Sequence, residues 1–374
     1  MRAPEAGPAS PGREQRILRI IETARAKRPR FTDERVTMAH GAGGKASQTL
    51  VEGLLLPAFD NEALAELGDA GAVDLGPAGA PAADHRLAMT TDTFVVRPTR
   101  FPGGSIGELA VNGTVNDLAA AGARALAITL ALVLEEGLAA EDLRAEVEAI
   151  ARAAGDAGVH IVAGDTKVVE RGHADGMYIT TSGVGRLDPR ASLSPRALRA
   201  GDRVLLSRTV GEHGTAIMLA RGELGLDAEV ESDTRSLWPV AEVLLDVAGE
   251  NLRCMRDATR GGVASVLNEL ARASGVGVSV REAAIPVRPD VAAACELLGI
   301  DPMYVANEGV MVAVVAPEAA EAALAALRRV GGCEAAAELG EVVSEPPGLV
   351  VVETAFGGRR VMDLLAGDPL PRIC

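Results

Sequence analysis

The sequence predicts a protein of two domains with mixed sheet and helix layers, of the α+β or α/β class, and three observations support this. Segments typical of strands alternate with segments of helical period along most of the chain. A chain of 374 residues is long enough for two full hydrophobic cores. Around residues 187–199 the composition changes to Pro, Ser and Arg, which is typical of a domain boundary. We therefore expect a mobile extension (1–35), a first domain with a mixed sheet and helices (36–186), a second domain with an α/β sandwich (187–365) and a flexible tail (366–374).

Composition and charge limit the kinds of partner. Hydrophobic residues make up 48% of the chain but aromatic residues only 2%, so Ala, Val, Leu and Ile must form the cores. A net charge of −15 argues against nucleic acid or an anionic membrane as the main partner. Nucleotides remain compatible with this charge, because Lys, Mg²⁺ and helix N-termini act locally.

No apolar run approaches the ~20 residues of a membrane span. The N-terminus lacks an apolar signal core, and we expect a cytoplasmic protein. The four cysteines are scattered, which predicts free thiols and no structural zinc site or disulfide framework.

The first ordered elements surround a glycine-rich loop. Gly41, Gly43 and Gly44 precede Lys45 and a helical segment at Ala46–Leu56, which predicts a loop that handles phosphate groups. The glycine spacing is not that of a P-loop, and no strand precedes it. The loop that follows, Asp69–Asp84, is rich in Gly, Ala and Pro and is expected to be disordered.

A strand and a helix then bring polar residues into an apolar context. Leu87–Thr93 is a predicted strand that contains Asp92, and Ile106–Ala121 is a predicted helix. Asn116 and Asp117 lie on that helix opposite its apolar side, between small residues that indicate close packing. The alternatives of a functional site and a satisfied helix–helix hydrogen bond stay open here, since a buried unpaired carboxylate would cost several kcal/mol.

The remaining first-domain elements are a strand at Ala125–Leu134, a helix at Glu141–Ala154, a strand at Val159–Ala163 and a last strand at Tyr178–Gly185. We expect Val159–Ala163 to be a buried strand ending at Gly164, Asp165, Thr166 and Lys167. A carboxylate, a hydroxyl and an ammonium group at one strand end suit a metal–phosphate complex. The alternative is a turn with a surface ion pair.

In the second domain, a strand is predicted at Arg203–Ser207 and helices at Glu212–Arg221, Val240–Ala248 and Ala264–Ala273. Asp257 or Thr259 could cap the helix Ala264–Ala273, and its glycine-rich entrance could also bind an anion. Glu308 precedes a Val-rich strand, a place where Glu is usually an exposed turn residue. Gly348–Glu353 is the last predicted strand, and Cys374 ends a tail with two prolines, which forbid regular structure there.

Several of these segments together resemble the HypE family, the carbamoyl dehydratases of nickel–iron hydrogenase maturation. The resemblance covers about residues 36–374 and is carried by His40–Lys45, Thr91–Val96, Val115–Ala119, Gly164–Lys167, Arg256–Gly262, Asn307–Gly309 and Pro371–Cys374. The Asp-Thr, Asn-Asp and Gly-Asp-Thr elements are shared with the wider PurM-like superfamily, which is related to aminoimidazole-ribonucleotide synthetase. The Pro-Arg-Ile-Cys ending narrows the resemblance to HypE.

The resemblance implies a PurM-like fold, a homodimer and a reaction on the protein's own Cys374 thiol. The carbamoyltransferase HypF would place a carbamoyl group on that sulfur, ATP would drive its dehydration to a thiocyanate, and the HypC–HypD complex would receive the cyanide. Lys167 would stabilise negative charge and Glu308 would act as general base. Mg²⁺ would be held by Asp92, Asp117, Asp165 and Asp257, and ATP also by Gly41, Gly43, Gly44, Lys45, Asn116, Thr166 and Thr259.

Two other functions stay open. A small-molecule kinase of the thiamine-phosphate type would share the nucleotide site but would not need Cys374. A non-catalytic scaffold would bind nucleotide and maturation partners without chemistry. Selenophosphate synthesis is less favoured, because the loop Gly41–Lys45 contains no Cys.

Overall fold

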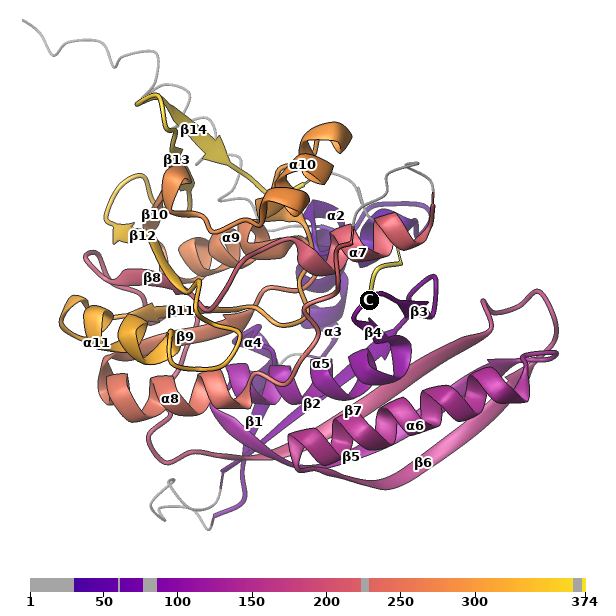
Figure 1. Ribbon diagram of the computed structural model, residues 1–374. Helices are drawn as coiled ribbons and strands as arrows, with labels where there is room; N and C mark the ends of the chain where they lie inside the picture. Colours follow the sequence, from indigo (N-terminus) through magenta and orange to yellow (C-terminus); the bar gives the residue numbers. More distant parts are fainter. Residues whose placement is uncertain (1–29, 60, 77–85, 223–228, 366–371) are drawn as a thin grey trace, which may run out of the picture.

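The protein is described by a computed structural model for residues 30–59, 61–76, 86–222, 229–365 and 372–374. It contains two large sheets that lie side by side, with helices on both (Figure 1). This confirms the two-domain α+β architecture expected from the sequence. Most of the expected extension, much of the expected disordered loop and residues 366–371 of the expected flexible tail lie outside the described residues.

The first part of the chain begins with short helices and continues into the first sheet. Its elements are η1 (Met38–Gly41), α2 (Lys45–Leu50), η2 (Val51–Leu55), α3 (Leu56–Phe59), α4 (Glu62–Ala65), β1 (Gly71–Asp74), β2 (Arg86–Phe94), β3 (Arg100–Phe101), β4 (Gly104–Ser105), α5 (Ile106–Ala120), β5 (Ala123–Glu135), α6 (Ala140–Ala157), β6 (His160–Val169) and β7 (Met177–Leu187). The five-stranded sheet has the order β1-β2-β7-β5-β6. Only β5 and β6 run parallel, so the sheet is mixed.

Helix α5 is the centre of the first domain. It packs on β2, β5 and β7 and also against α6 and α8. Every residue of α5 except Glu108 and Asp117 is buried, so the expected close packing around Asn116 is confirmed. Ser105 precedes the helix in an extended conformation at the N-cap position, where Ser is favoured.

The second part forms a seven-stranded sheet of order β14-β13-β10-β12-β8-β11-β9. Its elements are β8 (Arg203–Leu206), α7 (Glu212–Ala220), α8 (Trp238–Ala248), η4 (Gly249–Asn251), β9 (Leu252–Asp257), α9 (Gly262–Ser274), β10 (Gly277–Arg281), η5 (Glu282–Ala284), α10 (Pro289–Leu298), η6 (Pro302–Tyr304), β11 (Met311–Val315), α11 (Pro317–Leu327), β12 (Ala337–Val343), β13 (Val350–Glu353) and β14 (Arg359–Met362). Separate apolar clusters join the sheet to α9 and to the pair α8 and α11, which gives a layered arrangement.

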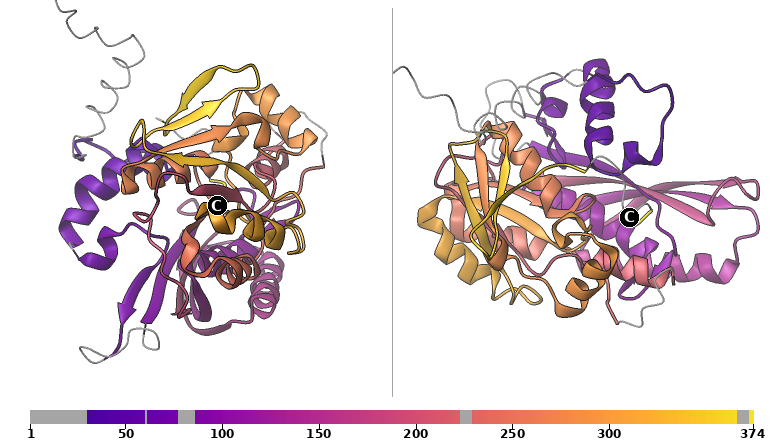
Figure 2. Two further views of the ribbon diagram at one scale, coloured as in Figure 1. Left: turned by 90° about the vertical axis from the view of Figure 1, so that its left-hand side faces the viewer. Right: turned by 90° about the horizontal axis from the view of Figure 1, so that it is seen from above.

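One of the hydrophobic clusters contains residues from both domains. Ile106 and Val111 of α5 belong to the same buried cluster as Ile217 of α7 and Val305. Ile373 of the tail is part of this cluster and only 4% exposed. The end of the chain therefore lies between α7 and the β3–β4 hairpin (Figures 1 and 2).

Two expectations about local structure are wrong. The segment Val159–Ala163 was expected to be a buried strand, but β6 is the edge of its sheet and is exposed along almost its whole length. Gly164–Lys167 lie inside this strand and not at its end. Capping of α9 by Asp257 or Thr259, which the sequence allows beside an anion site, is not observed, because Gly261 with φ of 76° is its N-cap and Asp257 ends β9. Among the described residues, no helix combines the length and the apolar character that a bilayer crossing requires.

Candidate active site

Four carboxylates gather where α5 and β2 of the first domain meet β9 of the second. Carboxylate oxygens of Asp69, Asp117 and Asp257 lie within 4.8 Å of one another. Asp92 joins this group through a hydrogen bond between its carboxyl group and that of Asp117. The hydroxyl of Thr90 donates to Oδ2 of Asp117 at 2.5 Å. Asp69, Asp92, Asp117 and Asp257 are called the acid cluster below.

The acid cluster is electrostatically strained. Burial, together with repulsion among the carboxylates, raises the pKa of Asp117 and of Asp257 well above the usual range. Burial also raises the pKa of Asp69 to about 6, although Arg256 opposes the shift. The Arg256 Nε lies 2.9 Å from Oδ1 of Asp69. The single ion pair between Arg256 and Asp69 does not neutralise the charge of four neighbouring carboxylates, so the acid cluster favours the binding of a further cation.

The donor set fits a hard divalent cation. Carboxylate oxygens are the ligands that Mg²⁺ prefers, and three of them already converge. Burial would make uncompensated carboxylates costly, and a bound divalent ion removes this cost. Asp69, Asp92, Asp117 and Asp257 are the residues that would hold it.

Glu308 lies beside the acid cluster on a tightly held backbone. Its side chain lines a small pocket with Asp92, Asp117 and Asp257, and it is 3% exposed, so the expectation of an exposed turn residue is wrong. Burial, followed by repulsion from Asp233, raises its pKa well above the usual range. Burial is one way in which enzymes raise the pKa of a carboxylate that acts as a general base, so the surroundings of Glu308 fit that role.

Asp233 and Asn116 fix the position of Glu308. The two carboxylate oxygens of Asp233 accept hydrogen bonds from the backbone N–H groups of Glu308 and Gly309 at 3.0 and 3.1 Å. The amide of Asn116 donates to the Glu308 carbonyl at 3.2 Å and to the Arg235 carbonyl at 3.0 Å. Its oxygen accepts from the N–H of Leu237 at 2.7 Å. Asn116 therefore joins segments of backbone, and the structure does not place it among the pocket-lining residues.

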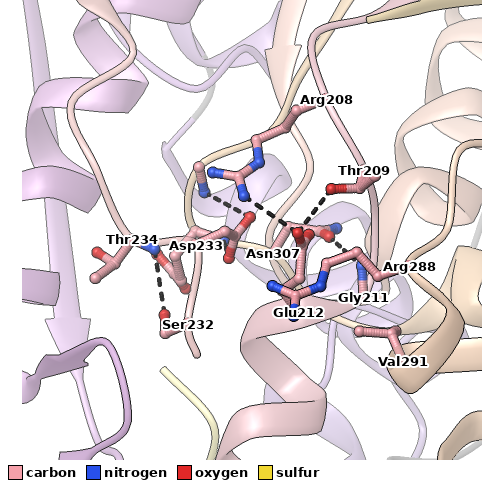
Figure 3. Close-up of polar contacts among 12 residues, drawn as sticks. Arg208, Thr209, Gly211, Glu212, Ser232, Asp233, Thr234, Arg288, Val291 and Asn307 are labelled. Atoms are coloured by element: carbon pink, nitrogen blue, oxygen red, sulfur yellow. Dashed lines mark hydrogen bonds and ion pairs between the residues drawn. The ribbon is translucent and has the colours of Figure 1, made fainter. Parts of the chain in front are cut away.

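A neighbouring network holds the same segment from the other side. The Oδ1 of Asn307 accepts from the N–H of Gly211 at 2.7 Å, at the start of α7 (Figure 3). Glu212 accepts from the Thr209 hydroxyl at 2.6 Å and from Arg208 at 3.1 Å. The loop that carries Glu308 is thus tied to α7 as well as to α5.

The C-terminal cysteine reaches this pocket. Cys374 lines it together with Glu308, Thr259 and Arg260, and the thiol donates a hydrogen bond to Glu308. Burial raises the pKa of the Cys374 thiol to about 12, although Arg260 opposes the shift. The docked thiol is therefore protonated. Cys254, Cys295 and Cys333 are buried, and like Cys374 they are free thiols, as the sequence predicts.

The glycine-rich loop borders a second, larger cavity that adjoins the first. This cavity of about 390 Å³ is lined by Gly41, Gly44, Arg260 and Cys374, among others. Gly43 has a φ of 74°, and a Cβ there would lie 2.8 Å from the Arg260 carbonyl, so glycine is required. Lys45 turns away from the acid cluster, because its Nζ donates to Asp363 at 2.9 Å.

The structure does not bring Asp165, Thr166 and Lys167 to the acid cluster of the same chain. Asp92 is paired in register with Thr181, whose hydroxyl contacts α5. Asp165 belongs to the adjacent row, formed by Thr93, Thr180 and Ala131, and therefore points to the opposite face. Asp92 lies on β2 and Asp165 on β6, and these two strands are three strand spacings, about 14 Å, apart in the sheet. The Nζ of Lys167 donates to Asp165 at 2.7 Å on this exposed face, as in a surface ion pair.

Two residues of the site were not selected from the sequence. Asp69 lies in the bend before β1, in the part of the stretch Asp69–Asp84 that was expected to be disordered but is ordered. Its position between Gly68 and Gly71 was the available signal, since glycines permit a close approach of backbone. Arg260 lines both cavities, and it follows Thr259 in a motif already singled out.

This arrangement, a carboxylate-lined site between two α+β domains, is that of a known class. The family model "AIR synthase related protein, N-terminal domain" matches residues 67–187, and the corresponding C-terminal model matches residues 199–353.

Closer relatives define the family. The chain is 50% identical over 339 residues to the carbamoyl dehydratase HypE of Bradyrhizobium diazoefficiens, covering 91% of this chain and 96% of that protein. A crystal structure of a HypE–HypF complex matches with a TM-score of 0.79 and 43% identity over 84% of this chain and 99% of that chain. A HypE structure in complex with ATP matches with a TM-score of 0.75 and 44% identity, over 91% and 100%. The chain belongs to the HypE family of carbamoyl dehydratases.

Proposed function

We propose that this protein uses ATP to dehydrate a carbamoyl group carried on the sulfur of its own Cys374. The observation that supports this most directly is the docking of Cys374 beside Glu308 at the acid cluster. The carbamoyl oxygen attacks the γ-phosphorus of ATP and ADP leaves. The C–O bond then breaks, inorganic phosphate leaves with that oxygen, and both N–H protons are lost as the C≡N bond forms. The products are a thiocyanate on Cys374, ADP, phosphate and a proton.

The residues divide this work between positioning and proton transfer. Glu308 accepts protons from the carbamoyl nitrogen, since its carboxyl group already contacts the sulfur that carries the group. Arg260 lies between the two cavities, where it would contact phosphate oxygens as charge develops. Mg²⁺ held by the acid cluster would supply neutralisation of the triphosphate charge.

The proposed nucleotide site combines most of the residues expected from the sequence with Asp69 and Arg260, which the structure adds. The triphosphate would lie between the glycine-rich loop and the acid cluster. The structure supports Gly41, Gly43, Gly44, Asp69, Asp92, Asp117, Asp257, Thr259 and Arg260. Lys45 stays a prediction from the sequence, because its Nζ is bound to Asp363 in this structure. Asn116 would act through the backbone of Glu308.

A homodimer would complete this site. The side chains of Asp165 and Lys167 lie on the face of the sheet opposite that of Asp92, and Thr166 between them is three strands away from Asp92, so we infer that they serve the acid cluster of a second copy. Strand β6 is an exposed edge with apolar side chains, including Val162 (61% exposed) and Val168 (67%). Such an edge favours pairing with another chain. Lys167 of one copy would then stabilise negative charge on the carbamoyl oxygen bound by the other.

The test is mass spectrometry of protein carbamoylated on Cys374 and then given Mg²⁺ and ATP. The C-terminal peptide should lose the mass of one water molecule while ADP and phosphate appear in equal amounts. Glu308→Gln should keep the carbamoyl adduct intact. An adduct that keeps its mass in the wild-type protein while ADP is released would contradict dehydration and favour a kinase acting on another substrate.

The distinction from a scaffold and from a small-molecule kinase uses the same samples. A scaffold would bind ATP and release no ADP. A kinase of the thiamine-phosphate type would keep full activity after deletion of residues 371–374. The family membership, the buried place of Ile373 and the partly buried place of Cys374 favour the dehydratase.

The proposed partners follow from the chemistry on Cys374. HypF, seen with a relative in a crystal structure, would donate the carbamoyl group. The HypC–HypD complex would accept the cyano group for the iron centre. Both exchanges require the tail to leave its pocket, and we propose that they occur in the cytoplasm.

A further inference from the structure

The last peptide group of the chain is held by a buried histidine of the second domain. The Nε2 of His213 lies 2.5 Å from the carbonyl oxygen of Ile373. Its Nδ1 lies 2.8 Å from the hydroxyl of Ser232. A carbonyl only accepts, so Nε2 carries the proton and Nδ1 accepts from Ser232. The ring is thus used at both nitrogens.

The position of this ring is fixed by its surroundings. His213 is in the first turn of α7 and is fully buried. Phe101 packs edge-on against it, with ring centroids 5.5 Å apart. Ser232 is itself anchored, because its N–H donates to the Pro102 carbonyl at 2.8 Å. The side chain therefore presents one N–H group to the tail in a set direction.

The tail backbone is held on both sides of the reacting cysteine. The N–H of Val95 donates to the C-terminal carboxylate of Cys374 and the N–H of Arg97 to the Arg372 carbonyl, both at 3.1 Å. The peptide group between Ile373 and Cys374 is planar. Once its carbonyl is held, the Cα of Cys374 is held too. The contact of Val95 with the end of the chain restrains the backbone rotation at Cys374, so the sulfur moves mainly by rotation about the Cα–Cβ bond.

The docked tail also carries strain that opposes these contacts. Arg372 has a φ of 59°, which is unfavourable for a residue other than Gly. Arg221 donates to the Arg372 carbonyl at 2.7 Å, and Arg372 forms an ion pair with Asp175. The backbone strain at Arg372 offsets part of the energy of these contacts. Loss of the His213 hydrogen bond should therefore shift the docking equilibrium measurably.

We propose that His213 is the positioning residue of the tail: its Nε2–H, oriented by Ser232, sets the depth at which Cys374 is presented to Glu308. This role deepens the proposed dehydration and rests on it for its catalytic consequence, but the docking itself does not. His213 contacts the carbonyl one residue before the reacting cysteine and does not touch the carbamoyl group.

The first experiment measures docking without catalysis, in the full-length protein. Wild type, His213→Leu and His213→Gln are treated with iodoacetamide, and alkylation of the C-terminal peptide is followed by mass spectrometry. Leu fills the space without a donor, whereas Gln keeps an N–H group near the place of Nε2. His213→Leu should alkylate roughly two- to tenfold faster at Cys374, because a net hydrogen bond shifts an equilibrium by that factor. His213→Gln should stay near wild type.

A matched control separates tail release from general loosening of α7. Thr215→Val removes another buried polar group from the same helix, one whose hydroxyl faces the Cys295 thiol and not the tail. It should leave Cys374 alkylation unchanged. Equal rates in wild type and His213→Leu would overturn the proposal, as would equal acceleration in His213→Gln or Thr215→Val.

The second experiment measures the consequence for the reaction. In single turnovers of carbamoylated protein, His213→Leu should lower the maximal rate on the order of tenfold with an unchanged KM for ATP, because misplacement of the reacting group affects the chemical step. His213→Gln should recover most of the rate. A changed KM with an unchanged maximal rate would overturn the positioning role. If the wild type itself yields no thiocyanate, the proposed function fails, and the alkylation comparison still decides the role of His213.

Discussion

Single side chains in this molecule act mainly by holding other groups in place. Asp233 receives two backbone N–H groups, Asn116 uses both its amide protons and its oxygen, and Glu308 owes its position to both. These residues are polar and buried, and an unpaired buried polar group costs about 1–3 kcal/mol. Their identities could be read from the sequence, but their partners could not, because residues 116, 233 and 308 are far apart along the chain.

Asp233→Asn tests this positioning directly. An amide can accept with only one of its two terminal atoms, so the N–H of Glu308 or Gly309 would face an NH₂ group. We expect the free energy of unfolding to fall by about 1–3 kcal/mol and the maximal rate of dehydration to fall on the order of tenfold. Asp202→Asn is the matched control, since Asp202 is equally buried and accepts from the N–H of Arg199. It should lose comparable stability and keep the rate per folded molecule; an equal rate loss in both variants would refute the assignment.

His213 also predicts a pH dependence of stability. Burial lowers the pKa of its imidazole from 6.5 to about 4. The unfolded chain therefore binds a proton below pH 6.5 before the folded chain does, and this contribution to stability is present above pH 6.5 and lost as the pH falls to 4. In urea unfolding curves, wild type should lose about 3 kcal/mol more than His213→Gln between pH 7 and pH 4. Parallel pH profiles for the two proteins would contradict the buried neutral imidazole.

Among the elements, β6 shows most clearly where sequence patterns stop being informative. Its apolar run favours a strand buried on both faces, as in the middle of a parallel sheet. The strand forms and pairs with β5 as a parallel neighbour, but it is the last strand and remains exposed. Place within a sheet depends on pairing between distant segments, which a local pattern does not contain. Helix α5 was predicted from the helical period of its sequence. The prediction of one apolar side does not hold, because the helix is buried on all sides except at Glu108 and Asp117.

A charge on β6 tests the proposed dimer. Val162→Lys places an ammonium group on the exposed apolar edge, where it would oppose pairing with a second copy. We expect analytical ultracentrifugation to show a shift from dimer to monomer, with thermal stability of the monomer nearly unchanged. Val147→Lys on α6, also exposed, is the control and should stay dimeric. A Val162→Lys protein that remains a dimer would exclude this edge from the interface.

A mixture of two inactive variants tests whether the site is shared. Lys167→Ala should remove the residue contributed to the partner, and Cys374→Ala should remove the carrier of the same chain. Each homodimer should be inactive. A heterodimer regains one complete site, and dehydration should recover to about half of the wild-type rate per dimer. No recovery, despite heterodimers seen by native mass spectrometry, would place Lys167 and Cys374 in sites of the same chain.

Across the whole molecule, the acid cluster and the tail both join the two domains. Asp117 comes from α5 and Asp257 from β9, and Ile373 packs into the core that α5 shares with α7. The sequence predicted two domains and most of these residues. It did not predict that the domains share a core, because the contributing segments are separated by more than a hundred residues.

Because the acid cluster bridges the domains, Mg²⁺ should stabilise the protein as a whole. Without a cation, repulsion between buried carboxylates opposes the contact of the domains; with one, the same groups become ligands. At a concentration one hundred times its Kd, Mg²⁺ should add about 2.7 kcal/mol. We expect scanning calorimetry to show a higher Tm with Mg²⁺ and a return to the original value after chelation.

Asp257→Asn should raise the Tm of the metal-free protein, since one repelling charge is removed, and should abolish the response to Mg²⁺. Asp74→Asn, at an exposed position of β1, should change neither. An undiminished Mg²⁺ response in Asp257→Asn would mean that the ion binds elsewhere and that the carboxylates between the domains have another purpose.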